Sequence, residues 1–166
     1  MRANWFSFNN AGTSAVDLHI IDTIAGDDES SGMTVSAFLA QLRALPRTVQ
    51  KLVVHVNSPG GDAVAGLNIT HALRSESSKG RIVETVIDGL AASIASVIAM
   101  AGRTVLMADN AVLMIHSPVA VMTATASGAR QVAGTLDSLR DQMVTAYQWH
   151  SHLSAAELTE LCRLRT

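Results

Sequence analysis

The chain has 166 residues, of which 48% are hydrophobic and 16% are charged, and its formal net charge at pH 7 is −2. The charged fraction lies below the roughly 25% of ordinary soluble domains. No apolar run reaches the about 20 residues that a membrane span needs, and no basic cluster indicates a nucleic-acid partner. The length predicts one domain. A single cysteine, Cys162, excludes an internal disulfide framework and cysteine-rich zinc or redox motifs, so we interpret it as a spectator thiol.

The N-terminal third is expected to hold an arm, two strands and a helix. Residues 1–15 are polar and glycine-containing apart from three aromatic side chains, which predicts a flexible arm whose aromatics dock on another surface, such as a neighbouring subunit, with residues 16–166 as the folded domain. The start of the chain lacks an apolar core of signal-peptide length, so we expect a cytoplasmic protein. Periodicity, caps and breakers predict, in order, a strand over 15–24, a turn over 25–32, a helix over 35–45 that Thr34 caps and Pro46 ends, and a strand over 51–56.

The middle of the chain repeats the order strand, glycine turn, helix. The predicted elements are a tight loop over 57–62, a helix over 63–73, a polar linker over 75–80, a strand over 82–87, a turn at 88–89 and a small-residue helix over 91–101 that Gly102 closes. This repeat predicts a layered α/β fold with crossover connections. Sites in such folds gather beyond the carboxyl ends of the strands, where both glycine segments would lie.

The last third predicts two strands and two helices. We expect strands over 104–107 and 111–115 with a turn at 108–110 between them, a loop or weak strand over 119–128, and a helix over 129–152. Ser154 and Glu157 form a capping-box pattern at the start of a final short helix.

Three segments carry residues suited to nucleophilic catalysis. Ser93 would stand at a helix start among small neighbours, near free amides and the positive end of the helix dipole. The glycines of Asn57–Gly61 can aim a backbone amide outward, and His116 ends an apolar strand. Each feature alone has a structural interpretation: a helix cap, a β-turn or a core histidine. The spacing of the other histidines does not suit zinc, and phosphate-loop and GxSxG patterns are lacking, so we assign no metal and no cofactor.

The segments Asn57–Gly61, Gly89–Ser93 and Met114–Pro118, in this order and spacing, closely resemble the proteolytic subunit family of Clp protease. The residues of these motifs are most similar to those of the phage and prophage branch of this family, the ClpP-like head-maturation proteases. The resemblance covers about Leu18 to Leu161, nearly the whole chain.

The resemblance implies a fold of repeated ββα units wound in a right-handed spiral, related to that of the crotonases, and a homo-oligomeric ring (a heptamer or double ring) around an inner chamber. A mean hydropathy of +0.27 agrees with surface that is covered by other subunits. By position, Ser93 matches the nucleophile, His116 the general base, and the N–H groups of Gly61 and Ile94 the oxyanion hole. Ser96, one turn further along, is the less favoured nucleophile. The substrate would be a polypeptide.

The acidic third member of the family triad has no match, because the segment where it is expected, 161–166, holds no carboxylate side chain. The C-terminal end therefore looks truncated, unless the protein works as a Ser–His dyad or another acid substitutes; Asp137 and Asp141 are weak candidates. Three functions stay open: a serine endopeptidase of phage head maturation acting in the host cytoplasm, a housekeeping subunit fed by a Clp ATPase, and a catalytically impaired assembly protein. An acyl-CoA enzyme of the crotonase type is disfavoured, since such enzymes lack this Ser–His pair.

Overall fold

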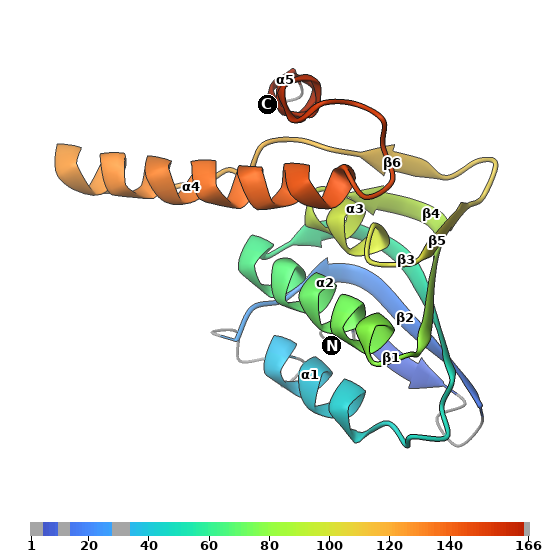
Figure 1. Ribbon diagram of the computed structural model, residues 1–166. Helices are drawn as coiled ribbons and strands as arrows, with labels where there is room; N and C mark the ends of the chain where they lie inside the picture. The colour runs from blue at the N-terminus through green and yellow to red at the C-terminus, as the bar shows by residue number, and fades with distance from the viewer. Residues whose placement is uncertain (1–4, 10–13, 28–33, 165–166) are drawn as a thin grey trace. The chain divides into compact units, whose positions relative to one another are not determined.

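The computed structural model describes residues 5–9, 14–27 and 34–164. The chain divides into two compact units, the first through Met114 and the second from Ile115 onward, and each is described by itself. The first unit contains strands β1 (Phe6–Asn9), β2 (Ala15–Ile24), β3 (Lys51–Gly61), β4 (Ile82–Ala92), β5 (Thr104–Met107) and β6 (Val112–Met114), and helices α1 (Val35–Ala44), α2 (Ala63–Ser78) and α3 (Ile94–Ala99) (Figure 1).

The strands described in the first unit form a sheet in the order β1-β2-β3-β4-β5, with β6 pairing with β4 beyond β5. β1 is antiparallel to β2, and β2, β3, β4 and β5 run parallel to one another. The helices α1, α2 and α3 lie in the crossovers between successive parallel strands, so each strand–helix unit advances the chain by one strand across the sheet. The predicted α/β class is confirmed.

Alternation along the central strands buries one face of this sheet. In β2, Val16, Leu18 and Ile20 are fully buried, while the residues between them are partly exposed. β3 and β4 repeat this pattern. The helices lie on the buried face (Figure 1). Because successive side chains of a strand point to opposite faces, the sheet has a covered face and a half-exposed face within this unit.

The N-terminal segment differs from the flexible arm expected over residues 1–15. Residues 6–9 form β1, and Trp5 and Phe6 are each only 2% exposed. The indole of Trp5 stacks on the ring of Phe38 from α1, with centroids 5.9 Å apart. These aromatics therefore belong to the core of their own unit, because burying such rings against a helix outweighs the polar residues around them. Residues 1–4 and 10–13 of the expected arm lie outside the described residues.

Both glycine turns are also corrected. β3 continues through the expected loop to Gly61, which pairs with Ile24 of β2, and β4 continues through the expected turn at 88–89 to Ala92. Ladder pairing with β2 keeps the segment that contains Gly60 and Gly61 extended. Helix α2 runs to Ser78 through part of the expected linker, and α3 covers less than the predicted helix over 91–101. The strands over 15–24 and 104–107 are confirmed; residues 28–33 of the expected turn lie outside the described residues.

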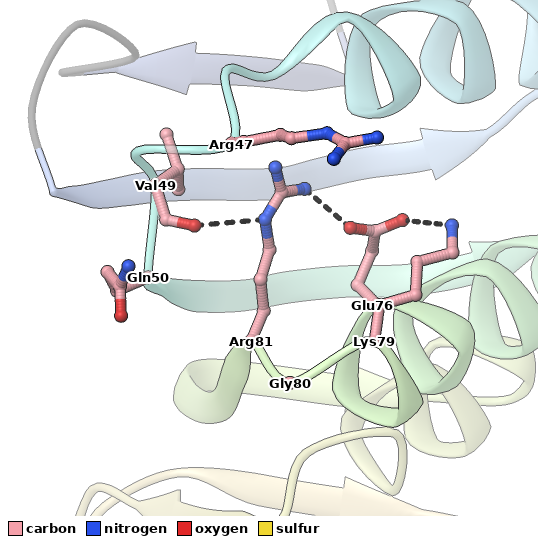
Figure 2. A pocket seen from close by; sticks show the side chains of 7 residues that line it. All are labelled: Arg47, Val49, Gln50, Glu76, Lys79, Gly80 and Arg81. Carbon is pink, nitrogen blue, oxygen red and sulfur yellow. Dashed lines mark hydrogen bonds and ion pairs between the residues drawn. The ribbon is translucent and has the colours of Figure 1, made fainter.

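A buried ion pair joins the amino ends of β3 and β4. The guanidinium of Arg81 contacts the Glu76 carboxylate and donates to the carbonyl of Val49 over 3.0 Å, and Lys79 contacts the same carboxylate (Figure 2). The Glu76 side chain is only 7% exposed. These groups line a cavity of about 390 Å³ together with Arg47, Gln50 and Gly80 (Figure 2).

The second unit consists of an irregular segment followed by helices α4 (Ala126–Tyr147) and α5 (Ala155–Arg163), which pack on each other. Within the described residues 115–125 no strand forms, so the weak strand considered over 119–128 is absent, and α4 begins and ends earlier than the predicted helix over 129–152. The capping box of Ser154 and Glu157 is confirmed. The Ser117 amide donates to the carbonyl of Cys162 over 3.0 Å, which ties the irregular segment to α5.

Candidate active site

Ser93 occupies the single residue between the end of β4 and the start of α3. Its backbone has φ 56° and ψ −131°, an unfavourable conformation for a residue with a side chain. Such strain is worth about 1–3 kcal/mol and clusters at functional sites. A serine on a strained strand-to-helix turn is the arrangement that exposes the nucleophile of α/β-hydrolases. The fold thus produces this turn without the GxSxG pattern that usually indicates it.

Neighbouring elements hold the Ser93 backbone on both sides. Its N–H donates to the carbonyl of Met114, at the end of β6, over 2.9 Å, and its carbonyl accepts from the Ser96 amide over 3.0 Å. The Ser96 hydroxyl is buried and donates to the same carbonyl. The Ser96 hydroxyl thus serves to hold the Ser93 backbone. The Ser93 side chain is half-buried, whereas Ala92 and Ile94 beside it are buried.

Gly60 lies directly against Ser93. A Cβ atom at this glycine would lie 2.6 Å from Cβ of Ser93 and 2.8 Å from the Ala92 carbonyl oxygen, and its φ is +100°. Both the space and the backbone conformation therefore require glycine here. The end of β3 and the strand-to-helix turn are therefore in close contact at this glycine.

The amide of Gly61 points toward β4. Asp62, the next residue, donates its N–H to the carbonyl of Ile24 in β2 over 3.0 Å. Because successive N–H groups of a strand point to opposite sides in the plane of the sheet, the Gly61 N–H points away from β2. β4 and Ser93 lie on that side.

A second amide, that of Ile94, lies close to Gly60. Ile94 is the first residue of α3, so its N–H has no acceptor within the helix. The missing side chain of Gly60 leaves this nitrogen uncovered, since a Cβ there would lie 3.2 Å from it. The structure thus brings together the expected residues Gly61, Ser93 and Ile94.

The expected base and acids belong to the second unit. His116 is half-buried and follows Met114 by two residues. Asp137 and Asp141 lie on α4, where both contact the Arg140 guanidinium, at 2.7 and 2.8 Å, and their side chains are 64% and 68% exposed. The hydrogen bond that the Arg140 guanidinium donates to Asp141 is the largest cause that raises the pKa of Arg140. These carboxylates thus form exposed ion pairs.

A polar cluster that the sequence did not indicate lies on the half-exposed face of the sheet. Nδ1 of His55 is 3.1 Å from both carboxylate oxygens of Asp88, and the His19 ring stacks on His55 with centroids 4.7 Å apart. Their register across β2, β3 and β4 could be found only once the strands were aligned. Among the described residues, no group of three or more histidine, cysteine, aspartate or glutamate side chains is arranged to hold a metal ion.

The cavity of Figure 2 is separate from Ser93. It lies at the amino ends of β3 and β4, whereas Gly61 and Ser93 lie at their carboxyl ends. At about 3.3 Å per residue, an 11-residue strand separates the two places by roughly 30 Å.

Comparison with known proteins gives a family match over most of the chain. The family model of Clp protease matches residues 15–163. The ATP-dependent Clp protease proteolytic subunit of Bacteroides thetaiotaomicron is 31% identical over 129 residues, which are 75% of this chain and 56% of that protein. The subunit of the same name from Leuconostoc citreum is 32% identical over 123 residues, 70% of this chain and 58% of that protein. The translocation-enhancing protein TepA of Halalkalibacterium halodurans is 30% identical over 115 residues, 69% of this chain and 43% of that protein.

The aligned part of the chain spans a little over half the length of these Clp relatives, 56% and 58%. In the described part of the chain, no helix is both long and apolar enough to cross a membrane.

Proposed function

The chain belongs to the Clp protease family, and on this premise we propose that residues 16–166 form a serine endopeptidase domain with Ser93 as the nucleophile and His116 as the general base. The observation that carries the proposal is the strained turn at Ser93, which packs so closely against Gly60 that no side chain fits there. A reactive hydroxyl beside two preorganised donors is what acyl transfer requires.

The mechanism follows from these roles. Ser93 Oγ attacks the carbonyl carbon of the scissile peptide bond while His116 accepts the hydroxyl proton. The N–H groups of Gly61 and Ile94 donate to the oxyanion of the tetrahedral intermediate. His116 then gives its proton to the leaving amine, and an acyl-enzyme remains on Ser93. A water molecule, deprotonated by His116, then attacks the acyl carbonyl carbon, and His116 returns the proton to Ser93 Oγ as the carboxylic acid product leaves.

The motif around His116 supports its role as the base. The carbonyl of Met114, at the start of this motif, accepts the Ser93 N–H. His116 follows Met114 by two residues in the chain.

We assign the triad acid to neither Asp137 nor Asp141, since both form exposed ion pairs with Arg140. Ser93 and His116 are the residues of this chain to which we assign the reaction. Because an orienting acid fixes the tautomer and stabilises the charged imidazole, a dyad works more slowly than a complete triad.

The proposed substrate is an extended polypeptide, and the protein is a homo-oligomer. Exposed apolar side chains on β5 and β6 support association: Leu106, Met107, Val112 and Leu113 are 41–53% exposed.

Two candidate roles for the peptidase follow from its motifs and its relatives. The similarity of the glycine motifs to those of phage proteases supports capsid or scaffold proteins as substrates in the host cytoplasm. The names of the relatives describe ATP-dependent enzymes, which supports a second candidate, a subunit fed by a Clp ATPase. Cleavage of capsid protein without ATP favours the first candidate; co-purification with a Clp ATPase favours the second.

A fluorophosphonate probe tests the active site. The probe should label the chain at Ser93, as located by peptide mass mapping, and Ser93→Ala should abolish the labelling. His116→Ala should slow it by about 10²- to 10⁴-fold, the usual contribution of a general base.

Matched variants complete this experiment. Ser96→Ala should still be labelled at Ser93, because the Ser96 hydroxyl is buried and bonded to the Ser93 carbonyl. His152→Ala, which removes an exposed histidine, should react like the unaltered chain. Persistent labelling of Ser93→Ala, or labelling that maps to another serine, would contradict the proposed nucleophile.

A further inference from the structure

The pairing of β3 becomes irregular over the residues that lead to Gly61. Against β4, the pair Val56 with Ile87 is followed by Ser58 with Ala91, so two extra residues of β4 lie opposite Asn57. Against β2, the register also shifts between Ile21 and Thr23. Such bulges leave backbone groups without ladder partners, which must be satisfied in another way.

The side chain of Asn57 fills the irregularity on the β4 side. Its Oδ1 accepts a hydrogen bond from the Leu90 amide over 3.1 Å. Gly89 makes room for it, since a Cβ there would lie 3.0 Å from this same oxygen. Asn57 thus replaces a missing ladder bond three residues before Ser93, at the point where β4 bends toward the strand-to-helix turn.

The side chain of Ser58 fills the irregularity on the β2 side. It is fully buried, donates to the Asp22 carbonyl over 2.5 Å and accepts from the Gly60 amide over 3.1 Å. Asp22 has φ +63°, and its own carboxylate accepts from the Thr23 amide over 2.8 Å. The Ser58 hydroxyl therefore connects Asp22, a strained residue of β2, to the N–H of Gly60, the residue before Gly61.

From these contacts we infer that Asn57 and Ser58 are positioning residues of the active site. Ser58 sets the direction of the Gly61 N–H through Gly60, and Asn57 sets the path by which β4 brings Ser93 to the same place. Neither acts on the substrate directly. The inference rests on the proposed function, because it assigns these side chains to an oxyanion hole and a nucleophile.

The test compares labelling rates of folded variants. Asn57→Ala and Ser58→Ala should each lower the second-order rate of fluorophosphonate labelling at Ser93 by about 10- to 100-fold, somewhat less than removal of an oxyanion donor. Asn57→Asp keeps an oxygen acceptor of the same shape and should restore the rate to within about threefold of the unaltered chain. With a peptide substrate, the loss should fall on kcat more than on KM.

A control separates positioning from general weakening of the fold. Thr85 is another fully buried hydroxyl of the sheet, and it donates to the Ala99 carbonyl over 2.6 Å. Thr85→Val should lower the unfolding midpoint to a similar extent as Ser58→Ala but leave the labelling rate unchanged, when all variants are assayed well below their circular-dichroism midpoints.

The outcomes are distinguishable. If the unaltered chain is not labelled at Ser93, the proposed function is overturned and this inference with it. If it is labelled but Asn57→Ala and Ser58→Ala react at its rate, the inference alone is overturned. It is likewise overturned if Thr85→Val slows labelling as much as Ser58→Ala, or if Asn57→Asp fails to restore the rate.

Discussion

Gly60→Ala tests whether close contact between two backbones holds the nucleophile. The added methyl group would lie 2.6 Å from Cβ of Ser93 and 2.8 Å from the Ala92 carbonyl oxygen, where contacts below 3.0 Å force a shift. The native φ of +100° adds backbone strain. Strain is worth about 1–3 kcal/mol and overpacking about 1–3 kcal/mol more. We therefore expect Gly60→Ala to lower the free energy of unfolding by about 2–6 kcal/mol.

Gly80→Ala is the matched control. Gly80 has nearly the same φ, +98°, but a Cβ there meets nothing within 4 Å. This variant reports the backbone strain without the clash, so the difference between the two variants isolates the contact with Ser93. We expect Gly80→Ala to lower stability by about 1–3 kcal/mol and to leave the reactivity of Ser93 unchanged.

Urea unfolding followed by circular dichroism, together with the fluorophosphonate labelling rate, measures both effects. A displacement of Ser93 by about 1 Å is enough to slow its reaction about 10²-fold. The reasoning is refuted if the two variants lose stability equally within about 0.5 kcal/mol, the usual error of additivity, and Gly60→Ala reacts at the unaltered rate.

Two further predictions concern groups away from Ser93. Arg81→Leu should lower the free energy of unfolding by about 3–5 kcal/mol, because it leaves the Glu76 carboxylate, 7% exposed, without its main partner; Arg163→Ala, at an ion pair whose side chains are 70% and 52% exposed, should leave the urea midpoint unchanged. Equal midpoints for the two variants would contradict the structural role of Arg81. Burial raises the pKa of the Cys162 thiol above its usual 9.0, so a disulfide reagent at pH 8 should react with this thiol only after urea is added. Since the folded pKa is the higher one, stability from this thiol is present below pH 9.0 and falls as the pH rises beyond it, and rapid reaction of the native chain would contradict its burial.

Sequence patterns within a few residues correctly predicted the helix starts and strands that depend on neighbouring residues alone. The start of α1 at Thr34 and the capping box at Ser154 were predicted because a cap is a hydrogen bond between residues three apart. The strand over 15–24 followed from its alternating and then continuous apolar residues.

The glycine segments could not be predicted correctly from local signals. Asn57–Gly61 has the composition of a turn, but pairing with residues of β2 that lie more than thirty positions earlier in the chain extends it. Asp88–Gly89 lies in the irregular part of β4 opposite Asn57, which only the alignment of the two strands reveals. The same limit applies to β1, because burial of Trp5 and Phe6 depends on Phe38 of a later helix.

The candidate site shows the same division. Ser93, Gly61 and Ile94 were found from motif resemblance, and the structure brings these residues together. The strained φ of Ser93 could not be predicted, because the carbonyl that accepts the Ser93 N–H belongs to Met114, twenty-one residues further along the chain. The small residues around it, Ala91 and Ala92, were the local sign that backbones approach closely there.

Helix α3 is too short to be stable alone, so its direction is inherited from its neighbour. Gly66 of α2 leaves the space that the first residue of α3 occupies, since a Cβ at Gly66 would lie 2.2 Å from Cγ1 of Ile94. A side chain at residue 66 would therefore collide with Ile94, the residue after Ser93, and α2 and α3 would have to move apart. The position of Ser93 thus depends on the absence of a side chain at Gly66 in another helix. A larger residue at position 66 is a way to inactivate the site without changing any residue in it.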